Sequence, residues 1–524
     1  MKFMSWRIAA AAALMAAATI CRCAPSQAGE ALGAKVLEET CSRCHAALPS
    51  GGFERISEER KTPEGWELTI SRMERFDHVT VSAAQEAAVV KWLADRQGLA
   101  PAEAAPFRYA LERRPVVESP DDTDLAGMCA SCHTYARIGL ERRDKAEWLK
   151  LANMHLGQWP NIEYVATSRD REWWKLASTE IPAKLGAKWP LETKAWSEWK
   201  THRHANLAGS WRVAGHRAGK GDYAGDLVIR PNGDDHYSIT YKITYSDGTK
   251  SFGKGSAIVY TGYEWRGTVR LGKEKIHEVY ALSADGNRLS GRWFRDGQDG
   301  IGADVVAVRG VDAIAGVEPR FIRSGQPSKL TIIGSGLKGT VQLGAGIVVD
   351  KVLSATPGAV TILATAAKDT PPGERAVAVG KAQSASALVV YDRVKAVEVE
   401  PGIAVARMGG NGGPIAPALC QFEAVAYTKT ADGAPLRIGA MPAKWEVANF
   451  DETAAKDRDA SFGGHIDRNG LFTPGLAGPN PKRGGYDNAA NLSVKATMAE
   501  GGAAVEGAAH LYVAPQRWND APIR

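Results

Sequence analysis

The spacing of apolar residues changes near residue 205 and divides the chain into two parts. Before that point, apolar residues recur at intervals of three and four, as in amphipathic helices. After it, short runs alternate apolar and polar residues and are separated by Gly, Asn-Gly and Asp-Gly turns, as in strands joined by tight turns. We therefore predict a multidomain protein, with an all-α part over residues 29–205 followed by all-β domains.

One helix of the first part has both of its ends marked in the sequence. Ser82 and Gln85 have the spacing of a capping box, in which each side chain bonds the other residue's backbone N–H. Apolar Val89 and Leu93 follow on one face, and Gly98 is a typical helix stop. The pattern predicts a helix that begins after Ser82 and ends before Gly98.

The first part also contains an internal repeat. Each copy has an Arg-Ile pair, a tryptophan eleven residues after the arginine, and a candidate metal ligand seven residues after the tryptophan. The matched positions are Arg55, Trp66 and Met73 in the first copy and Arg137, Trp148 and His155 in the second. We predict two small helical units of the same fold, residues 29–110 and 111–205.

The β part divides into three stretches and a tail. Residues 206–310 contain seven or eight short strands with tight turns such as Asn232-Gly233, and they predict a small up-and-down barrel. Residues 311–395 and 396–515 each have the strand pattern of a small immunoglobulin-like sandwich. Residues 516–524 show no periodicity and are predicted to form a C-terminal arm.

The N-terminus has the features of a secretory signal peptide. Lys2 and Arg7 give a basic start, residues 8–20 form an alanine-rich apolar run, and Ser26 and Ala28 mark a small-x-small cleavage site. The apolar run is shorter than the roughly 20 residues that a membrane-spanning helix requires. We expect residues 1–28 to be removed on export, and we expect no membrane span in the rest of the chain.

Charge and composition exclude several functions. The formal net charge is +6, and it falls to +3 when the signal peptide leaves with its three basic residues. No block of Lys and Arg suggests nucleic-acid binding. The chain also has no nucleotide-binding glycine loop, nucleophile motif or carboxylate pair at helical spacing, so we predict no catalytic residue in it.

Two Cys-x-x-Cys-His pentads carry the chemistry of the chain. They stand 88 residues apart and consist of Cys41, Cys44 and His45 and of Cys129, Cys132 and His133. This is the attachment signature of c-type haem, in which two thiols form thioethers with the haem and the histidine binds the iron. A bare Cys-x-x-Cys would leave zinc or dithiol chemistry open, but the trailing histidine, present twice, favours haem. We predict two covalently bound haem c groups, and haem attachment after export indicates a bacterial periplasm.

The repeat predicts the second axial ligand of each iron. Met73 and His155 occupy the same position in the two units, so a duplicated fold should present them to the two irons in the same way. His78 is an alternative for the first haem, and Met154 is an alternative for the second.

Cys420 is the one cysteine that belongs neither to the signal peptide nor to a pentad. We expect its thiol to be buried and to behave as a small apolar side chain. The alternative is a covalent link to a partner chain.

The layout as a whole resembles the α subunit of quinohemoprotein amine dehydrogenase. Two pentads at this spacing, followed by a long all-β stretch, match that family's dihaem cytochrome c domain and its three β domains, one barrel and two immunoglobulin-like sandwiches. The resemblance covers essentially the whole mature chain. In that family one haem has His/Met ligands and the other has two histidines, which fits Met73 and His155.

The resemblance implies a periplasmic enzyme that oxidatively deaminates primary amines. The substrate-oxidising quinone, cysteine tryptophylquinone, would lie in a very small γ subunit, and a β-propeller subunit would complete the heterotrimer. This chain would take electrons one at a time through its haems. It would then pass them to a soluble carrier, either a blue copper protein or a cytochrome c.

Two other functions remain open from the sequence. Dihaem cytochrome c peroxidases also carry two pentads, although they usually separate them more widely and lack a long all-β tail. A stand-alone dihaem electron carrier could use its β modules to bind polysaccharide or another protein. Co-purification would discriminate between these functions, because only the amine dehydrogenase requires a small cross-linked chain and a propeller chain.

Overall fold

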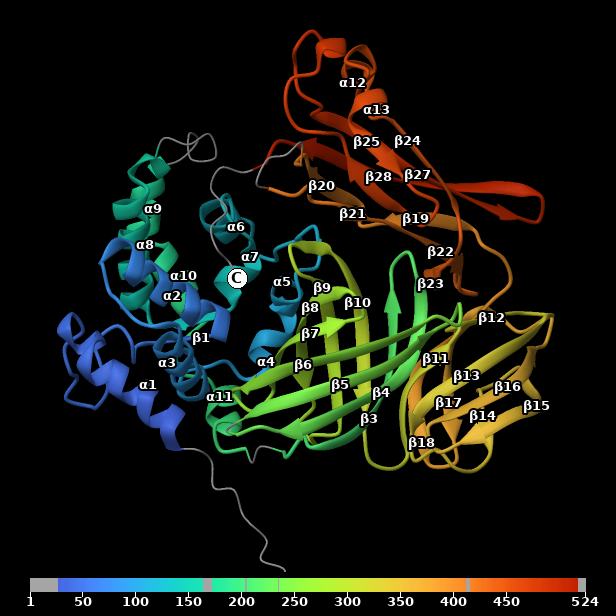
Figure 1. The fold of residues 1–524 in the computed structure, drawn as a ribbon, viewed down its shortest axis with the longest axis horizontal. Coiled ribbons are helices and arrows are strands. Elements are labelled where there is room, and N and C mark those ends of the chain that lie inside the picture. Colours follow the sequence, from blue (N-terminus) through green and yellow to red (C-terminus); the bar gives the residue numbers. More distant parts are fainter. Residues whose placement is uncertain (1–26, 164–171, 203–204, 234, 411–414, 517–524) are drawn as a thin grey trace, which may run out of the picture.

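The computed structural model describes residues 27–163, 172–202, 205–233, 235–410 and 415–516. Figure 1 shows a helical N-terminal region beside a central β-barrel, a second β region on the far side of the barrel, and a third above it. Most of the predicted signal peptide and of the predicted arm lies outside the described residues. None of the described helices is both long and apolar enough to cross a membrane.

The first helical unit is built around one small apolar core. Its elements are α1 (Gln27–Glu39), η1 (Cys41–Arg43), β1 (Glu59–Lys61), α2 (Pro63–Phe76) and α3 (Ala83–Arg96). Leu37 of α1, Trp66 of α2 and Leu93 of α3 meet in this core. The capping box at Ser82 is formed and starts α3, which confirms the predicted helix.

The second unit has its own core, in which Leu125, Trp148, Trp173 and Leu185 are buried. Its elements are α6 (Thr123–Cys129), α7 (Tyr135–Gly139), β2 (Glu141–Arg143), α8 (Lys145–Gln158), η3 (Pro160–Glu163), α9 (Trp173–Thr179), α10 (Ile181–Lys188) and α11 (Lys194–Trp199). The link between the units contains α4 (Pro101–Ala104), η2 (Ala105–Phe107) and α5 (Arg108–Leu111).

Helices α2 and α8 are the same element of the repeat. Each is 14 residues long, and their first residues, Pro63 and Lys145, stand 82 positions apart in the sequence. Each begins after a capping side chain, Thr62 or Asp144, and each buries its tryptophan, Trp66 or Trp148. The duplicated pattern in the sequence therefore corresponds to duplicated backbone structure.

The prediction of an all-α cytochrome domain is wrong, because the N-terminal region is helical only in part. Strands β1 and β2 pair as an antiparallel ladder that joins the two units. Their sequences, Glu-Arg-Lys and Glu-Arg-Arg, have no alternation of apolar and polar residues, so nothing in the sequence indicates strands. The ladder forms through tertiary contact between the two copies of the repeat.

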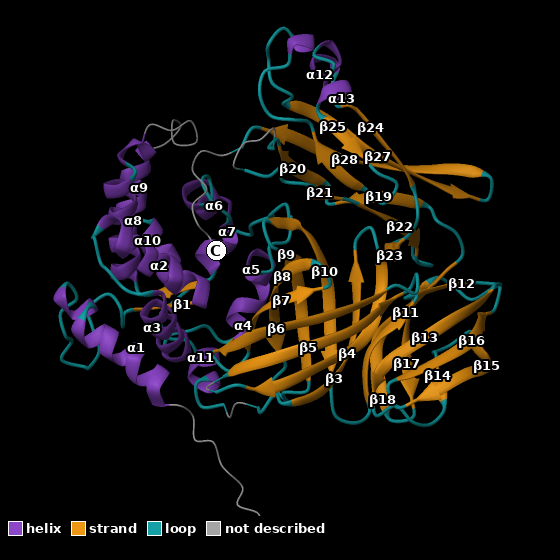
Figure 2. Ribbon diagram, viewed as in Figure 1, coloured by secondary structure: helices purple, strands orange, loops and turns teal. Residues whose placement is uncertain are grey.

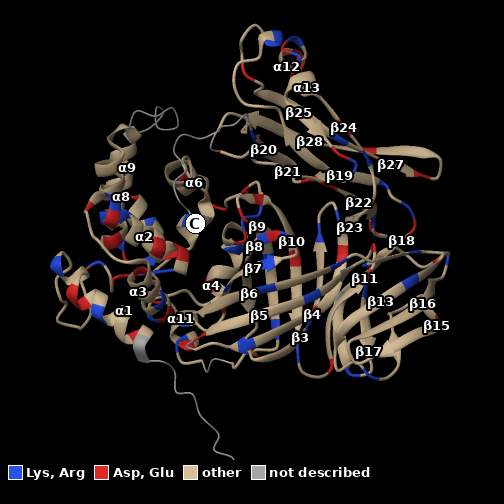
Figure 3. Ribbon diagram, in the orientation of Figure 1, with Lys and Arg blue, Asp and Glu red and all other residues tan. Residues whose placement is uncertain are grey.

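The ladder also marks a local two-fold axis. Arg60 pairs with Arg142, which is its own counterpart in the repeat, so the axis passes between these two residues. Both arginines are buried and share one carboxylate, Glu103, at 2.9 Å from Arg60 and 3.2 Å from Arg142. Figure 3 shows basic and acidic residues interleaved in this part of the molecule, around α2 and α8. The two units are thus joined by a buried ionic network.

Strands β3 to β10 form a closed barrel in which each strand pairs with the next and β10 pairs with β3 (Figure 2). Its core is rich in aromatic residues, including Trp211, Tyr223, Trp265 and Tyr280. The strands are β3 (Gly209–Arg217), β4 (Gly221–Pro231), β5 (His236–Tyr245), β6 (Lys250–Tyr260), β7 (Glu264–Leu271), β8 (Glu274–Leu282), β9 (Arg288–Arg295) and β10 (Gln298–Val308). The predicted barrel is confirmed.

The next region consists of two four-stranded sheets around one core. One sheet has the order β11-β13-β16-β15, and the other has the order β12-β18-β17-β14. The strands are β11 (Ala313–Glu318), β12 (Phe321–Arg323), β13 (Pro327–Ser335), β14 (Val341–Gln342), β15 (Ile347–Thr356), β16 (Ala359–Ala366), β17 (Gly373–Val379) and β18 (Ala382–Tyr391).

The last region contains sheets in the orders β19-β22-β23, β20-β28-β27-β24 and β21-β26-β25. Its elements are β19 (Ala396–Glu400), β20 (Ile403–Arg407), β21 (Cys420–Gln421), β22 (Glu423–Lys429), β23 (Pro435–Ala440), β24 (Lys444–Asn449), α12 (Glu452–Lys456), α13 (Asp459–Phe462), β25 (Gly464–Ile466), β26 (Leu471–Pro474), η5 (Pro481–Arg483), β27 (Ala490–Glu500) and β28 (Ala503–Ala514). The immunoglobulin-like classification of these last two regions remains a prediction.

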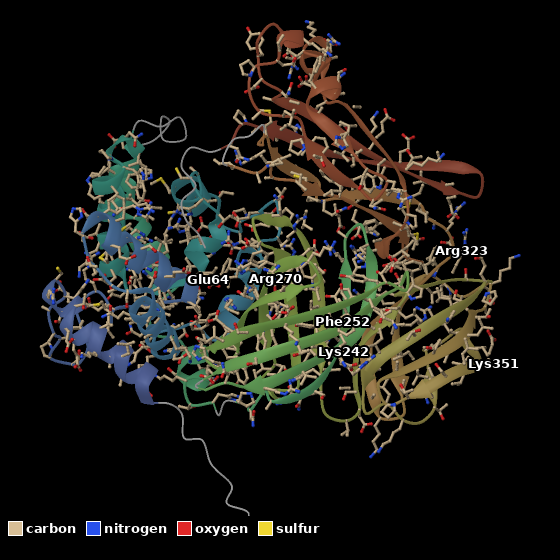
Figure 4. The ribbon with its side chains drawn as sticks, in the orientation of Figure 1. Glu64, Lys242, Phe252, Arg270, Arg323 and Lys351 are labelled. Carbon is tan, nitrogen blue, oxygen red and sulfur yellow. The ribbon has the colours of Figure 1, made fainter. Side chains whose placement is uncertain are left out.

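The helical region is fastened to the barrel by polar contacts along one seam. The side chain of Glu64, in the first turn of α2, accepts a hydrogen bond from Arg266 of β7 at 2.5 Å (Figure 4 labels Glu64). Asp95 of α3 accepts from the backbone N–H of Thr261 at 2.8 Å. The barrel therefore holds α2 and α3, the two helices that follow the first pentad.

Candidate functional site

The predicted ligands of the second haem line one cavity of about 460 Å³. Cys129 ends α6, Cys132 and His133 follow in the loop before α7, and His155 lies on α8. Most of the remaining wall is apolar and includes Met128, Ile138, Trp148, Leu151, Trp173, Ile181 and Leu185. A mostly apolar cavity with two thiols and two imidazoles at its wall suits a large hydrophobic cofactor such as haem.

His133 and His155 are close neighbours in this cavity. Their ring centroids lie 6.5 Å apart, and the ring planes are inclined by 48°. For a metal held by one nitrogen of each ring, bonds of about 2 Å and a nitrogen roughly 1.2 Å from each centroid give a separation of about 6.4 Å. The observed separation therefore fits a single iron between the two imidazoles.

All three predicted histidine ligands share one hydrogen-bonding arrangement. In each, Nδ1 donates to a backbone carbonyl: His45 to Glu54 at 3.0 Å, His133 to Thr134 at 3.0 Å and His155 to Leu151 at 2.8 Å. Because a carbonyl oxygen can only accept, the proton lies on Nδ1 and the neutral ring keeps its lone pair on Nε2. Metal-binding histidines are commonly held in this way by a partner on the second ring nitrogen.

The electrostatics of the second site keep its imidazoles neutral. Burial lowers the pKa of His133 to about 4, and the charge of Arg137 acts in the same direction, although the hydrogen bond to Thr134 opposes it. Burial also lowers the pKa of His155. Both rings are therefore unprotonated at neutral pH, which leaves Nε2 free to bind a metal.

The predicted ligands of the first haem lie on neighbouring elements of the first unit. Cys41 begins η1, Cys44 and His45 follow it, and Met73 lies in the last turn of α2. Cys41 packs against the core of this unit, while His45 and Met73 are partly exposed. Among the described residues no hydrogen bond joins His45 to Met73. The structure thus places Met73 as the repeat predicts but does not show it facing His45.

The alternative ligands are placed differently. His78 is exposed in the loop after α2 and has a left-handed backbone with φ of 55°. Met154 lines the same cavity as His155, and its Sδ lies 3.3 Å from Nη1 of Arg72. The imidazole of His155, in contrast, is already oriented by Leu151, and its Nε2 has no hydrogen-bond partner in the described part of the chain.

The five cysteines in the described part of the chain are unpaired. Cys44 and Cys132 are exposed, and Cys41 and Cys129 are partly buried. Burial raises the pKa of the Cys129 thiol to about 12. Cys420 is buried in the core of the last region, where burial raises its pKa to about 12. Its thiol behaves as the small apolar side chain that we expected.

Sequence reasoning missed three charged residues that line the second cavity. They are Arg72 on α2, Arg137 on α7 and Glu141 on β2. Arg137 belongs to the Arg-Ile pair that defines the repeat, so the sequence held a signal for it. Arg72 had no such signal, because it comes from the first unit and reaches the cavity of the second through tertiary packing.

Four family models match successive parts of the chain. The first is described as quinohemoprotein amine dehydrogenase A, alpha subunit, haem binding, and it matches residues 31–196. The others are described as domains II, III and IV of the quinohemoprotein amine dehydrogenase alpha subunit, and they match residues 204–310, 312–392 and 397–523. The haem-binding match includes both pentads and the cavity.

No curated protein matches the chain. Similar solved structures include a redesigned β-barrel (20% identity over 21% of this chain and 97% of that chain, TM-score 0.19) and another bound to DFHBI (20% identity, 20% and 98%, TM-score 0.18). A Bacteroides ovatus glucan-utilisation protein, SGBP-B, in complex with a mixed-linkage heptasaccharide is 11% identical over 60% of this chain and 67% of that chain (TM-score 0.18).

Proposed function

The chain belongs to the family of quinohemoprotein amine dehydrogenase alpha subunits, and we propose that it is the dihaem electron relay of such an enzyme. It is thus a haem-binding subunit of a multi-subunit oxidoreductase. The proposal adds the number of haems, their ligands and the direction of electron flow. The observation that carries it is the cavity in which an attachment motif and two neighbouring imidazoles meet.

We propose that the thiols of each pentad anchor one haem covalently. Cys41 and Cys44 would hold the first haem, and Cys129 and Cys132 would hold the second. Each bound haem supplies a one-electron iron couple. The chain's own task is to hold the iron ligands in place and to keep water away, and the apolar wall of the second cavity suits both tasks.

We propose that His133 and His155 would bind the iron of the second haem. Their separation fits one metal ion, neither Nε2 atom has a hydrogen-bond partner among the described residues, and both rings are neutral because they are buried. Met154 is the weaker candidate, because its sulfur already contacts the guanidinium of Arg72.

We propose that His45 and Met73 would bind the iron of the first haem. Met73 occupies on α2 the position that His155 occupies on α8. Nδ1 of His45 donates a hydrogen bond to a backbone carbonyl, as in the other two proposed ligand histidines. A thioether ligand raises the potential of a haem above that of a haem with two histidines. Electrons would therefore enter at the second haem and leave from the first.

The partners are proposed from the family. The electron donor would be a cysteine tryptophylquinone in a small γ subunit, reduced during oxidative deamination of primary amines, and a β-propeller subunit would complete the enzyme. The three β regions of this chain would provide the surface on which these subunits assemble. The acceptor would be a blue copper protein or a cytochrome c, and the complex would work in the periplasm.

A spectroscopic experiment on the purified complex tests this function. Intact-mass analysis of this chain should show two covalent haems, and addition of a primary amine should reduce the haem spectrum without any other reductant. A chain with one haem or none would overturn the dihaem assignment. Haems that stay oxidised with every primary amine tried would overturn the role in amine oxidation. The family matches give no support to the dihaem peroxidase alternative.

A further inference from the structure

Two arginines at the wall of the second cavity have no carboxylate partner among the described residues. Arg72 comes from α2 of the first unit, and Arg137 comes from α7 of the second. Within the described part of the chain, neither guanidinium has an acidic side chain within the 4.0 Å of an ion pair. The side chain of Arg72 makes one hydrogen bond there, to the thioether sulfur of Met154 at 3.3 Å. Both arginines therefore have donors to spare.

A partly buried guanidinium without an anion is costly, because it stays charged at every physiological pH and has five N–H donors to satisfy. A thioether is a weak acceptor and cannot replace a carboxylate. Arg72 and Arg137 line the same cavity, and Glu141 is the acidic residue among the residues of its lining. The two cations thus lie near enough to repel each other, and an anion between them would relieve the repulsion.

Glu141 is the carboxylate at this wall, but it is already engaged. Its Oε2 accepts two hydrogen bonds from Arg143, at 3.0 and 3.1 Å. Burial alone would raise the pKa of Glu141, yet Lys61, Arg143 and Arg72 together lower it, so it stays ionised. Behind the wall Lys61 and Arg143 also pair with Glu59. Among the residues that line the cavity, Glu141 alone stands against Arg72 and Arg137, so the lining has one positive charge in excess.

The local two-fold axis explains why the cations gather at the second cavity. Arg72 and Met154 are equivalent positions of α2 and α8, and they contact each other. The same backbone position therefore supplies a cation from the first unit and a thioether from the second. The counterpart of Arg137 is Arg55, whose Nε lies 3.9 Å from Glu147. The repeat is symmetric in backbone but not in charge.

From this arrangement we infer that Arg72 and Arg137 form a carboxylate-binding subsite that holds the propionate groups of the haem attached at Cys129 and Cys132. The inference rests on the proposed function, and it adds a role for a residue of the first unit in the cofactor site of the second. Guanidinium groups bind carboxylates through paired N–H···O bonds, which would fix the haem plane. Haem is a mostly apolar ring with two carboxylates, which matches this mostly apolar cavity with two arginines.

The subsite also bears on the potential of the second haem. Reduction of the iron adds one negative charge, and a nearby cation stabilises the reduced form. Arg72 and Arg137 should therefore raise the potential of the second haem, against the lowering effect of its two histidines. The two haems would then differ less in potential than their axial ligands alone predict.

The test uses the assembled complex with Arg72→Gln, Arg72→Met or Arg137→Gln, and Arg72→Met reproduces the side chain found at the equivalent position. Haem content comes first, by intact mass. Spectroelectrochemical titration then gives the midpoint potential of each haem, and resonance Raman spectroscopy reports the propionate bending vibrations. The control is Arg75→Gln, which removes the same charge from an exposed position of the same helix.

We expect each cavity variant to keep two haems, to lower the potential of the second haem more than the first, and to shift the propionate vibrations. The control should change neither. Unchanged potentials and vibrations in both Arg72 variants would overturn the subsite. A lowered potential with unchanged vibrations would also overturn it, because the arginines would then act at a distance without binding propionate. Wild-type chain lacking the second haem would instead contradict the proposed function itself.

Discussion

The two halves of the helical region share a backbone but differ where chemistry is expected. Helices α2 and α8 have the same length, the same kind of cap and a buried tryptophan at the same position. Yet the first places Arg72 and Met73 in its last turns, whereas the second places Met154 and His155 there. The two helices thus share a side-chain cap and a buried tryptophan, whereas the residues near the predicted irons differ.

The difference indicates how one fold can give two haems different properties. In the proposed assignment, the position shared by Met73 and His155 would decide whether an iron has sulfur or nitrogen as its second ligand, and that choice would change the potential. The position before it is Arg72 in the first unit and Met154 in the second. Arg72 places a cation at the second cavity, because its side chain reaches Met154 of the other unit. Two adjacent positions on one helix thus separate the two sites, and each can be tested by exchange.

The largest effect should come from removing an attachment site. In Cys129→Ala/Cys132→Ala we expect the chain to lose one of its two haems and the complex to lose amine-dependent reduction of the remaining one, because the entry site is gone. Intact mass and the haem spectrum measure both results. The matched variant Cys41→Ala/Cys44→Ala should also lose one haem, but amine should still reduce the other. Equal behaviour of the two variants would contradict the proposed order of electron flow.

Exchange of the axial ligand should have the next largest effect. Met73→His should lower the potential of one haem and remove the long-wavelength absorption band that arises from sulfur bound to ferric iron, because both haems then have two histidines. Spectroelectrochemistry of the complex measures both changes. His78→Ala is the control, since the alternative ligand is exposed and should leave the band intact. Persistence of the band in Met73→His would show that Met73 is not the ligand.

Much of this comparison was visible in the sequence. The spacing of Trp66 and Trp148 from their Arg-Ile pairs identified two equivalent helices, and the structure contains both with their tryptophans buried. The capping box at Ser82 and the alternating pattern of the barrel were also read correctly. These features are local, since a cap or a strand is specified by residues close together in the chain.

Features that depend on contact between the two units were not predictable in this way. The strands β1 and β2 consist of charged residues, five of the six are buried, and the strands pair with each other across the two units. Arg72 looks like a surface residue of α2, and its place at the second cavity follows from the way the units pack. Pairing across a local symmetry axis leaves no periodicity in either copy, so the all-α prediction failed at that point.

The junction between the units should respond to removal of its shared carboxylate. Glu103→Gln would leave Arg60 and Arg142 buried without a counter-ion, and we expect a loss of roughly 3–5 kcal/mol in the free energy of unfolding of the helical region. Denaturant titration followed by circular dichroism in the haem bands measures it. The control Glu39→Gln removes an exposed carboxylate whose lysine partner lies 3.8 Å away, and it should cost less than about 1 kcal/mol.

The same carboxylate predicts a pH dependence. Burial alone would raise the pKa of Glu103, but Arg60 and Arg142 outweigh it and lower the pKa to about 2. A depressed folded-state pKa stabilises the protein above the unfolded-state value of about 4.3, and that stabilisation is lost as the pH falls toward 2. Wild type should therefore lose stability across this interval more steeply than Glu103→Gln. Parallel curves for the two proteins would contradict the ionic role of Glu103.

The smallest effects should come from the caps that start the two equivalent helices. Asp144 accepts from the backbone N–H of Glu147 at 2.8 Å, and Thr62 accepts from that of Gly65 at 3.3 Å. We expect Asp144→Ala to cost about 1–1.5 kcal/mol and Thr62→Ala about 0.5–1 kcal/mol in the free energy of unfolding, because the aspartate also interacts with the helix dipole. Asp144→Asn keeps the cap without the charge, so it should cost only the dipole contribution of about 0.3–1 kcal/mol. Denaturant titration of the three variants measures these losses in the free energy of unfolding. An equal loss in Asp144→Asn and Asp144→Ala would contradict a contribution from the capping hydrogen bond, because it would assign the whole effect of Asp144 to its charge.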